Sequence, residues 1–392
     1  DRRIRKDGFH TYYNAYESHR FTYSTLLSAS VKKDLFYSRS RNYSGYRAKA
    51  LFSENIAESV YDNLIESVHQ NFQPLYKYFD LRKRLLGVDE LHAYDCSVPL
   101  VKNIKWHMPY EEAVEKIKIS LQPLGTEYIK RVEQGLLKDR WTDRYENKGK
   151  RSGAYSSGCY DSNPFILMNY REDNINSAYT LAHEAGHSMH SFYSRKNQPY
   201  LYSDYTIFVA EVASTFNEAL LTRHFLSQDI APEMRIYLIC REIDNFRGTL
   251  YRQTMFAEFE YQVYKAMEGN EPLTLETFKK IYRDLLGRYF GPGVVLDDCL
   301  SLECFRIPHF YFSFYVYKYA TGISAAYALA DRVISGGETE LNDYLGFLKS
   351  GGSKYPIDLL KSAGVDMLSP EPVKTALATF SVLVDELEQL TQ

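Results

Sequence analysis

The stretch LAHEAGHSMH, residues 181–190, constrains the fold more than any other part of the chain, because it sets two histidines four positions apart within a helical pattern. Residues 176–194 have the apolar spacing of a single helix. On such a helix His183 and His187 lie one turn apart on the same face, where two imidazoles can reach one tetrahedral Zn²⁺. Glu184 lies about 100° around the helix from His183, so we expect it to face a metal-bound water as a general base and not to bind the metal itself.

A third ligand is expected on the next helix, because a catalytic zinc needs three protein ligands and one open position. This helix is predicted to run from Ser203, and its 206–220 portion is apolar apart from one polar stripe. Glu211 and Glu218 lie two turns apart on that stripe. A buried carboxylate is costly unless it is paired or binds a metal. We therefore expect Glu211 to be the third ligand and Glu218 to accept the outer N–H of a ligand histidine.

The alternative to a metal site is a helix whose histidines are satisfied core residues. An HExxH pattern alone arises by chance and is only suggestive. Glu211 adds a third donor of the right type, so we predict one Zn²⁺ per chain, held by His183, His187 and Glu211. His190 follows three residues after His187, and we expect it to be structural or solvent-exposed because that helix face already has its pair.

One segment interrupts the helical pattern. Residues 152–170 predict a small β-hairpin, in which a turn cluster precedes the apolar and aromatic run at 165–170. A strand edge beside the motif helix could hold an extended peptide by main-chain hydrogen bonds. Gly153 and Ala154 would let a foreign backbone approach closely, and with Tyr155 they are the predicted substrate-binding strand.

The remainder of the chain reads as helix after helix, which predicts a mainly α fold. Helical patterns cover residues 10–50, 54–86, 109–137, 233–268, 273–289 and 370–390. Ser53 and Glu54 are plausible first residues of the second of these segments.

Composition excludes some classes of partner. The 47 basic and 50 acidic residues give a formal net charge of -3, so there is no electrostatic reason to expect nucleic acid. Apolar runs fall well short of the roughly 18 residues that span a bilayer, so no membrane partner is expected. The five cysteines are odd in number and form no CxxC pair, which indicates free thiols and a cytoplasmic location.

Four motifs in the same order resemble a known family. HEAGHSMH, with FVAEVASTFNE downstream, GKRSGAYSSGCYD upstream and RIPHFYFSFYVYKYATG near residue 310, is similar to the thimet-oligopeptidase-like zinc metallopeptidases, most closely their bacterial oligoendopeptidase F branch. The likeness extends to about residue 385. It implies one oligopeptidase catalytic domain over residues 1–392, with a zincin-like helical core at about 140–330, the hairpin beside the active-site helix, and a deep cleft. Family members carry a further N-terminal lobe, which we expect to be absent or truncated here.

The resemblance also implies a role for the aromatic segment near residue 310. By itself this segment reads as an aromatic core helix, and we prefer that interpretation for Tyr319. In the family a histidine and tyrosines from this region line the cleft and hydrogen-bond the developing oxyanion, a role that favours such donors. His309 matches the family histidine, and Tyr317 best matches the oxyanion tyrosine. Tyr311 and Tyr315 are then substrate-binding, and the choice among the three tyrosines stays open.

The expected function is a zinc-dependent endopeptidase that hydrolyses internal bonds of short oligopeptides, by attack of a zinc-bound water with Glu184 as general base. The resemblance implies a channel that admits short unfolded peptides and excludes folded proteins. A helical scaffold with a vestigial zinc site is one alternative, and it would bind peptides without cutting them. A hydrolase of non-peptide amides or esters is another, against which main-chain pairing at the 152–160 strand argues.

Overall fold

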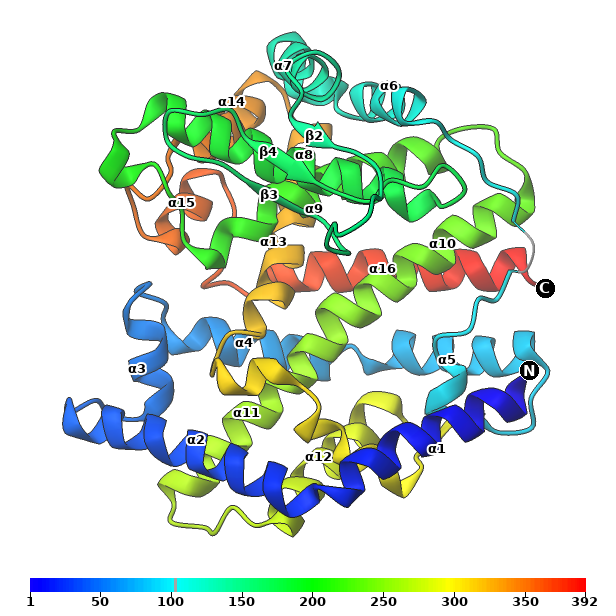
Figure 1. The fold of residues 1–392 in the computed structure, drawn as a ribbon, viewed down its shortest axis with the longest axis vertical. Coiled ribbons are helices and arrows are strands. Elements are labelled where there is room, and N and C mark those ends of the chain that lie inside the picture. Colours follow the sequence, from blue (N-terminus) through cyan, green and yellow to red (C-terminus); the bar gives the residue numbers. More distant parts are fainter. Residues whose placement is uncertain (102–103) are drawn as a thin grey trace. The chain divides into compact units, whose positions relative to one another are not determined.

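The structure is a computed structural model that describes residues 1–101 and 104–392. The chain divides into two compact units, which are described separately. Unit 1 comprises Asp1–Lys102, Ile239–Ala320 and Leu377–Gln392, and unit 2 comprises Asn103–Leu238 and Thr321–Ala376. Helices dominate both units, which confirms the mainly α prediction (Figure 1).

Unit 1 is built from long helices with one two-stranded sheet. Its helices are α1 (Arg2–Ser18), α2 (Arg20–Ser40), α3 (Tyr46–Phe52), α4 (Glu58–His69), α5 (Phe72–Leu86), α11 (Arg252–Glu268) and α12 (Leu275–Phe290). Shorter helical segments are η1 (Ala93–Asp95), the π-helical turn η4 (Arg247–Tyr251), η5 (Asp298–Phe305) and η6 (Pro308–Tyr311). The strands β1 (Leu91–His92) and β5 (Val294–Val295) pair in parallel. The helices α10 (Pro232–Phe246), α13 (Tyr317–Ser335) and α16 (Glu371–Leu390) each have residues in both units.

The start of α4 differs from the prediction. The sequence placed it at Ser53 and Glu54, whereas α4 begins at Glu58. Ser53 is instead the C-cap of α3, and Asn55 has a left-handed backbone with φ +50°. The prediction was wrong because polar residues that favour a helix start here end the preceding helix, and Asn is one of the few residues that adopts this conformation readily.

Unit 2 combines helices with a three-stranded sheet. Its elements are α6 (Tyr110–Ser120), η2 (Gln122–Leu124), α7 (Gly125–Leu137), β2 (Thr142–Asp143), β3 (Tyr155–Ser157), β4 (Phe165–Leu167), α8 (Ile175–Asn197), η3 (Tyr200–Tyr202), α9 (Ile207–Leu226), α14 (Glu338–Lys349) and α15 (Pro356–Ser362). The strand order is β2-β4-β3, with β3 antiparallel to β4 and β2 parallel to it. The predicted hairpin is thus confirmed, although its second strand is shorter than the 165–170 run. The two-residue strand β2 was not predicted.

The helices α8 and α9 form the core of unit 2, and β3 and β4 pack against α8 (Figure 1). The helix predicted at 176–194 is α8, whose N-cap Asn174 accepts a hydrogen bond from the next turn. The second helix, predicted from Ser203, begins at Ile207 because Thr206 has an extended backbone and serves as its N-cap. Most of α9 is buried, as expected for a helix that is apolar apart from one polar stripe.

The backbones of α8 and α9 lie close together at Gly186. A Cβ added there would lie 2.5 Å from the carbonyl oxygen of Ala213 and 2.6 Å from the Cα of Ser214. Because these are backbone atoms, they cannot swing aside as a flexible side chain could. Glycine therefore lets the two backbones touch at the level of the HEAGH motif.

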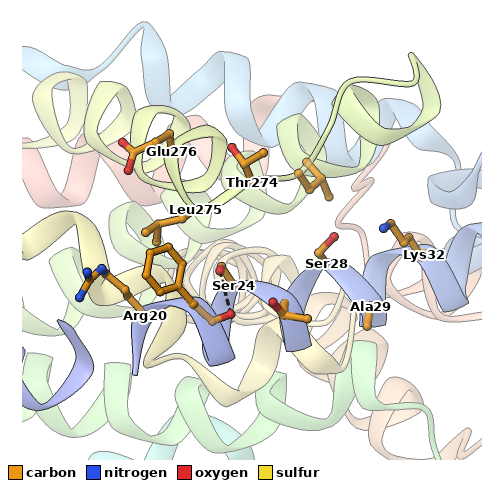
Figure 2. A pocket seen from close by; sticks show the side chains of 11 residues that line it. Arg20, Ser24, Ser28, Ala29, Lys32, Thr274, Leu275 and Glu276 are labelled. Atoms are coloured by element: carbon orange, nitrogen blue, oxygen red, sulfur yellow. Dashed lines mark hydrogen bonds between the residues drawn. The ribbon is translucent and has the colours of Figure 1, made fainter. Parts of the chain in front are cut away.

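The surface of unit 1 contains a groove that is separate from the residues predicted for the site. A groove of about 730 Å³ lies in unit 1, where Ser24 and Ser28 on α2 face Thr274 and Leu275 at the start of α12 (Figure 2). None of the residues predicted for the site lines this groove.

Within residues 1–101 and 104–392, no helix has both the length and the apolar composition that crossing a membrane requires.

Candidate metal centre

The three predicted metal ligands converge in unit 2. His183 and His187 extend from one face of α8, and Glu211 faces them from α9. The Nε2 atoms of the histidines are 3.1 Å apart, and Glu211 Oε2 lies 3.3 Å from Nε2 of His183 and 3.6 Å from Nε2 of His187. The three atoms form a nearly equilateral triangle, and these residues make up a group whose donors could share one cation.

This triangle has the size that a tetrahedral zinc requires. Zinc bonds of 2.0–2.1 Å at tetrahedral angles place neighbouring ligand atoms about 3.3 to 3.4 Å apart. The three separations of 3.1, 3.3 and 3.6 Å lie within a few tenths of an ångström of that value. Two imidazoles and a carboxylate are also a common ligand set of catalytic zinc. The residues therefore fit the metal in both donor type and spacing.

Glu218 contacts the outer nitrogen of the first histidine. Its Oε1 lies 2.7 Å from Nδ1 of His183, so His183 is held between Glu218 and Glu211. Burial lowers the pKa of His183, but hydrogen bonds with the two glutamates outweigh burial and raise this pKa to about 10. Burial and the charge on His183 lower the pKa of His187 to about 4. The pair of imidazoles thus takes up one proton at neutral pH.

Glu211 stays ionised within this arrangement. Burial raises the pKa of its carboxyl, but the hydrogen bond with His183 and the charges of both histidines outweigh burial, so the pKa lies below its ordinary value. The hydroxyl of Ser214, one turn further along α9, donates to the backbone carbonyl of Glu211 at 2.9 Å and lies 3.4 Å from Oε2 of its carboxylate. A carboxylate that is already charged at neutral pH is suited to bind a cation.

Glu184 lies on α8 with its side chain buried. The residue is 5% exposed, and its Oε2 has no hydrogen-bond partner among the residues that the structure describes. Burial raises the pKa of Glu184 to about 6, against the opposing effects of the His183 charge and of a hydrogen bond from the Ser156 backbone. A carboxyl group with a pKa near 6 changes protonation state close to neutral pH, as a proton-transfer group must.

The strand β3 presents one open edge. Ile166 in β4 donates its N–H to the Trp141 carbonyl on the β2 side, at 2.7 Å. Because main-chain groups alternate along a strand, Phe165 and Leu167 face β3 and pair there with Ser157 and Tyr155. The N–H and C=O of Ser156 therefore point away from β4, where the N–H hydrogen-bonds the Glu184 carboxyl and the C=O faces the edge of the sheet.

The predicted strand residues lie at the start of this edge. Gly153 has a left-handed backbone with φ +88°, and no atom would meet a Cβ built there. Tyr155 is 52% exposed. Ser156 was not singled out from the sequence, yet its hydroxyl lies 2.8 Å from that of Ser188 and joins β3 to α8. Strand alternation could have found it, because Ser156 must face opposite to Tyr155.

His190 has a structural role. It is 1% exposed, and its ring stacks on Tyr205 with centroids 3.7 Å apart and an angle of 4° between the planes. Burial and the nearby His187 lower the pKa of His190 to about 3, so it is neutral at physiological pH. Of the two expectations for this residue, structural and solvent-exposed, the structure shows the first.

The predicted residues near 310 belong to unit 1, and they differ in environment. The rings of His309 and Tyr315 are parallel within 6°, with centroids 5.5 Å apart. The Tyr319 hydroxyl donates to that of Tyr315 at 3.4 Å. Tyr311 is 36% exposed, whereas Tyr317 is fully buried and its ring centroid lies 5.2 Å from that of Tyr61. Tyr315 is therefore the tyrosine of this segment that is both partly exposed and stacked on His309.

Comparisons of sequence and of structure with known proteins agree on one peptidase family. Residues 1–379 match the model of peptidase family M3. Oligopeptidase PepF of Bacillus subtilis is 48% identical over 390 residues, which cover 100% of this chain and 58% of that protein. The oligoendopeptidase F homolog of Borreliella burgdorferi is 43% identical over 392 residues, covering 100% of this chain and 66% of that protein. The crystal structure of oligoendopeptidase-F from Enterococcus faecium superposes with a TM-score of 0.81 at 36% identity, covering 100% of this chain and 64% of that one. The chain thus spans less than two thirds of the length of these relatives.

Proposed function

The chain belongs to peptidase family M3, and from this premise we propose that it is a zinc-dependent endopeptidase that hydrolyses internal bonds of short oligopeptides. The observation that carries the proposal is the triangle formed by His183, His187 and Glu211, whose edges match tetrahedral zinc. We assign one Zn²⁺ per chain to these residues. When bound, the ion would supply a Lewis acid that acidifies water and polarises the scissile carbonyl.

Glu184 is the proposed general base. It accepts a proton from the attacking water and passes it to the leaving amine, which is the role that a buried carboxylate with a pKa near 6 supports. Because it lies on α8 next to the ligand His183, the same helix positions both groups.

His309 and one tyrosine are the proposed donors to the oxygen of the scissile carbonyl, on which charge grows as water attacks. The motif match ranked Tyr317 first. A donor must reach the substrate, and the complete burial of Tyr317 therefore favours Tyr315, which is partly exposed and stacked on His309. Tyr311 remains a candidate substrate contact because it too is exposed.

We propose that the strand β3 binds the substrate backbone through Gly153, Ala154 and Tyr155. The position of β3 at the edge of the sheet supports this role, since an extended peptide can add to an edge strand and hydrogen-bond main-chain groups such as the Ser156 C=O. The empty space beside Gly153 would admit the peptide without a steric clash.

A cytoplasmic location is also proposed. All five cysteines are free thiols, which is the expected state in a reducing compartment. The peptides available there as substrates would be short products of protein breakdown.

A digest of random short peptides, read by mass spectrometry, tests the proposed function. We expect internal cleavage that a chelator abolishes and that added Zn²⁺ restores. Glu211→Gln, which removes one anionic ligand, should need far more zinc for the same activity. Metal-loaded protein that binds the peptides and leaves them intact would support a scaffold instead. A folded protein that contains the preferred cleavage sequence should be spared.

A further inference from the structure

Two buried carboxyl groups hold the loop of residues 312–316, which joins η6 to α13 in unit 1. The backbone N–H of Phe314 donates to Oε1 of Glu260 at 2.9 Å. The hydroxyl of Ser313 donates to Oδ2 of Asp34 at 2.7 Å. Tyr315, which stacks on His309, follows these two tethered residues directly. The 312–316 loop is therefore fixed immediately before a residue to which the proposed function gives a role.

Glu260 is an unusual residue for the interior of a helical unit. It is 2% exposed on α11, and its Oε2 has no hydrogen-bond partner among residues 1–101 and 104–392. Burial raises the pKa of Glu260 well above its ordinary value. An apolar side chain of the same size would pack here at lower cost, because a half-satisfied buried polar group is unfavourable. Packing alone does not account for a glutamate, whereas the contact with Phe314 does.

The backbone that Glu260 contacts is itself strained. Phe314 has φ +56°, a conformation that bulky side chains rarely adopt and that persists only where the surroundings enforce it. Its ring packs among three tyrosines, with centroid distances of 5.3 Å to Tyr264, 5.5 Å to Tyr61 and 5.8 Å to Tyr46. The ring contacts and the hydrogen bond that the Phe314 N–H donates to Glu260 together enforce the unusual turn.

Asp34 provides the second tether from a different helix. It lies on α2 and accepts hydrogen bonds from Ser313 and from the hydroxyl of Tyr264, each at 2.7 Å. The Tyr46 hydroxyl lies 2.8 Å from that of Ser313. The loop is thus attached to α2, α3 and α11 by polar contacts on both of the residues that precede Tyr315.

We propose that Glu260 and Asp34 are positioning residues, which hold the 312–316 loop in its strained conformation and thereby set the orientation of Tyr315 against His309. The kinetic consequence rests on the proposed function, because it assumes that these two side chains assist peptide hydrolysis. The anchoring itself concerns unit 1 alone and can be measured without any activity.

Glu260→Met is the test variant, since methionine is similar in size and lacks the acceptor for the Phe314 N–H. Loss of a well-placed oxyanion donor costs about 100-fold or more in kcat, so misplacing His309 and Tyr315 should lower kcat by about tenfold to 100-fold with little change in KM. Glu260→Gln keeps the Oε1 acceptor, and we expect it to retain most of the wild-type kcat. Met255→Ala, a buried change on α11 that leaves both tethers in place, controls for loss of stability.

Hydrogen–deuterium exchange of fragments that contain residues 309–317 gives the second readout. Glu260→Met should speed exchange there, whereas Glu260→Gln and Met255→Ala should leave it as in the wild type. If Glu260→Met does not fold, Ser313→Ala takes its place. It removes a hydroxyl and with it the tether to Asp34, so it should also speed exchange and lower kcat, by smaller amounts. Wild-type exchange and wild-type kcat in a folded Glu260→Met protein overturn the inference. A wild-type protein that cuts no peptide contradicts the proposed function, and the exchange data still decide whether the loop is anchored.

Discussion

The carboxylate of Glu218 accepts a hydrogen bond from Nδ1 of His183 across a distance of 2.7 Å. In the neutral imidazole that can bind a metal, this contact selects the tautomer with the proton on Nδ1 and the lone pair on Nε2. The selected nitrogen is the one that faces His187 and Glu211. A residue that need not touch the metal thus decides which atom of His183 is available to bind it.

We expect Glu218→Ala to weaken zinc binding by about 10-fold to 100-fold, the usual cost of losing such a supporting hydrogen bond. The reason is that His183 would lose its fixed tautomer and ring orientation. Competition with a chromophoric chelator measures the affinity. Glu233→Ala, at an exposed glutamate on α10, is the control and should bind zinc as the wild type does. Equal affinities in the two variants would show that Glu218 does not support the metal.

Zinc binding should release about one proton per ion at pH 7. In protein stripped of metal, the pKa of His183 is raised to about 10 and that of His187 is lowered to about 4, so only His183 carries a proton to be displaced. Because the proton competes with the metal for His183, the apparent affinity for zinc should rise about tenfold for each unit that the pH increases between about 4 and about 10. Calorimetry in buffers of different ionisation enthalpy counts the protons. A proton count of zero and an affinity independent of pH would contradict the assignment.

Much of the candidate metal site could be predicted from the sequence, because helical periodicity shows which side chains share a helix face. His183 and His187 lie one turn apart on any helix, and Glu211 lies on the polar stripe of a helix that is otherwise apolar. These patterns predict which faces must meet. They do not predict the distance between α8 and α9, which depends on Gly186 and the Ala213 backbone.

The aromatic segment near 310 shows where sequence reasoning stops. Seven of the ten residues at 310–319 are Phe or Tyr, so no periodicity separates packed rings from exposed ones. Tyr317 proves to be fully buried, while Tyr315 is partly exposed. The loop of residues 312–316 has a left-handed backbone at Phe314 and depends on a hydrogen bond with Glu260. Glu260 lies more than fifty residues earlier in the chain. Local propensity gives no signal for a conformation that only tertiary contacts enforce.

Glu184→Gln should keep its zinc and lose nearly all turnover. Glutamine has nearly the same shape but cannot accept and deliver a proton, and general acid–base catalysis contributes about 10² to 10⁴ in rate. Metal content and kcat must be measured on the same preparation. His187→Ala is the contrasting variant, since it should lose both the metal and the activity. Substantial turnover by zinc-loaded Glu184→Gln would overturn the general-base role.

Gly186→Ala should destabilise the protein, although alanine is the better helix former by about 1 kcal/mol. The new methyl group would lie 2.5 Å from the Ala213 carbonyl oxygen, and the two backbones can relieve that clash only by moving apart. Overpacking of this kind costs about 1 to 3 kcal/mol, so the steric term outweighs the gain in helix propensity. The same movement would carry Glu211 away from the histidines, and zinc affinity should fall as well.

Gly346→Ala, on α14 of the same unit, separates the steric cost of the added methyl group from the gain in helix propensity. No atom lies within 4 Å of a Cβ built at Gly346, so only the propensity gain remains and the variant should be as stable as the wild type or more so. Denaturant unfolding of chelator-treated protein compares the free energies of unfolding, and a zinc titration compares the affinities. If both glycine variants are equally stable and bind zinc equally well, α8 and α9 do not need their close contact at Gly186. If Gly186→Ala alone loses both stability and zinc affinity, the contact at Gly186 sets the spacing on which the triangle of His183, His187 and Glu211 depends.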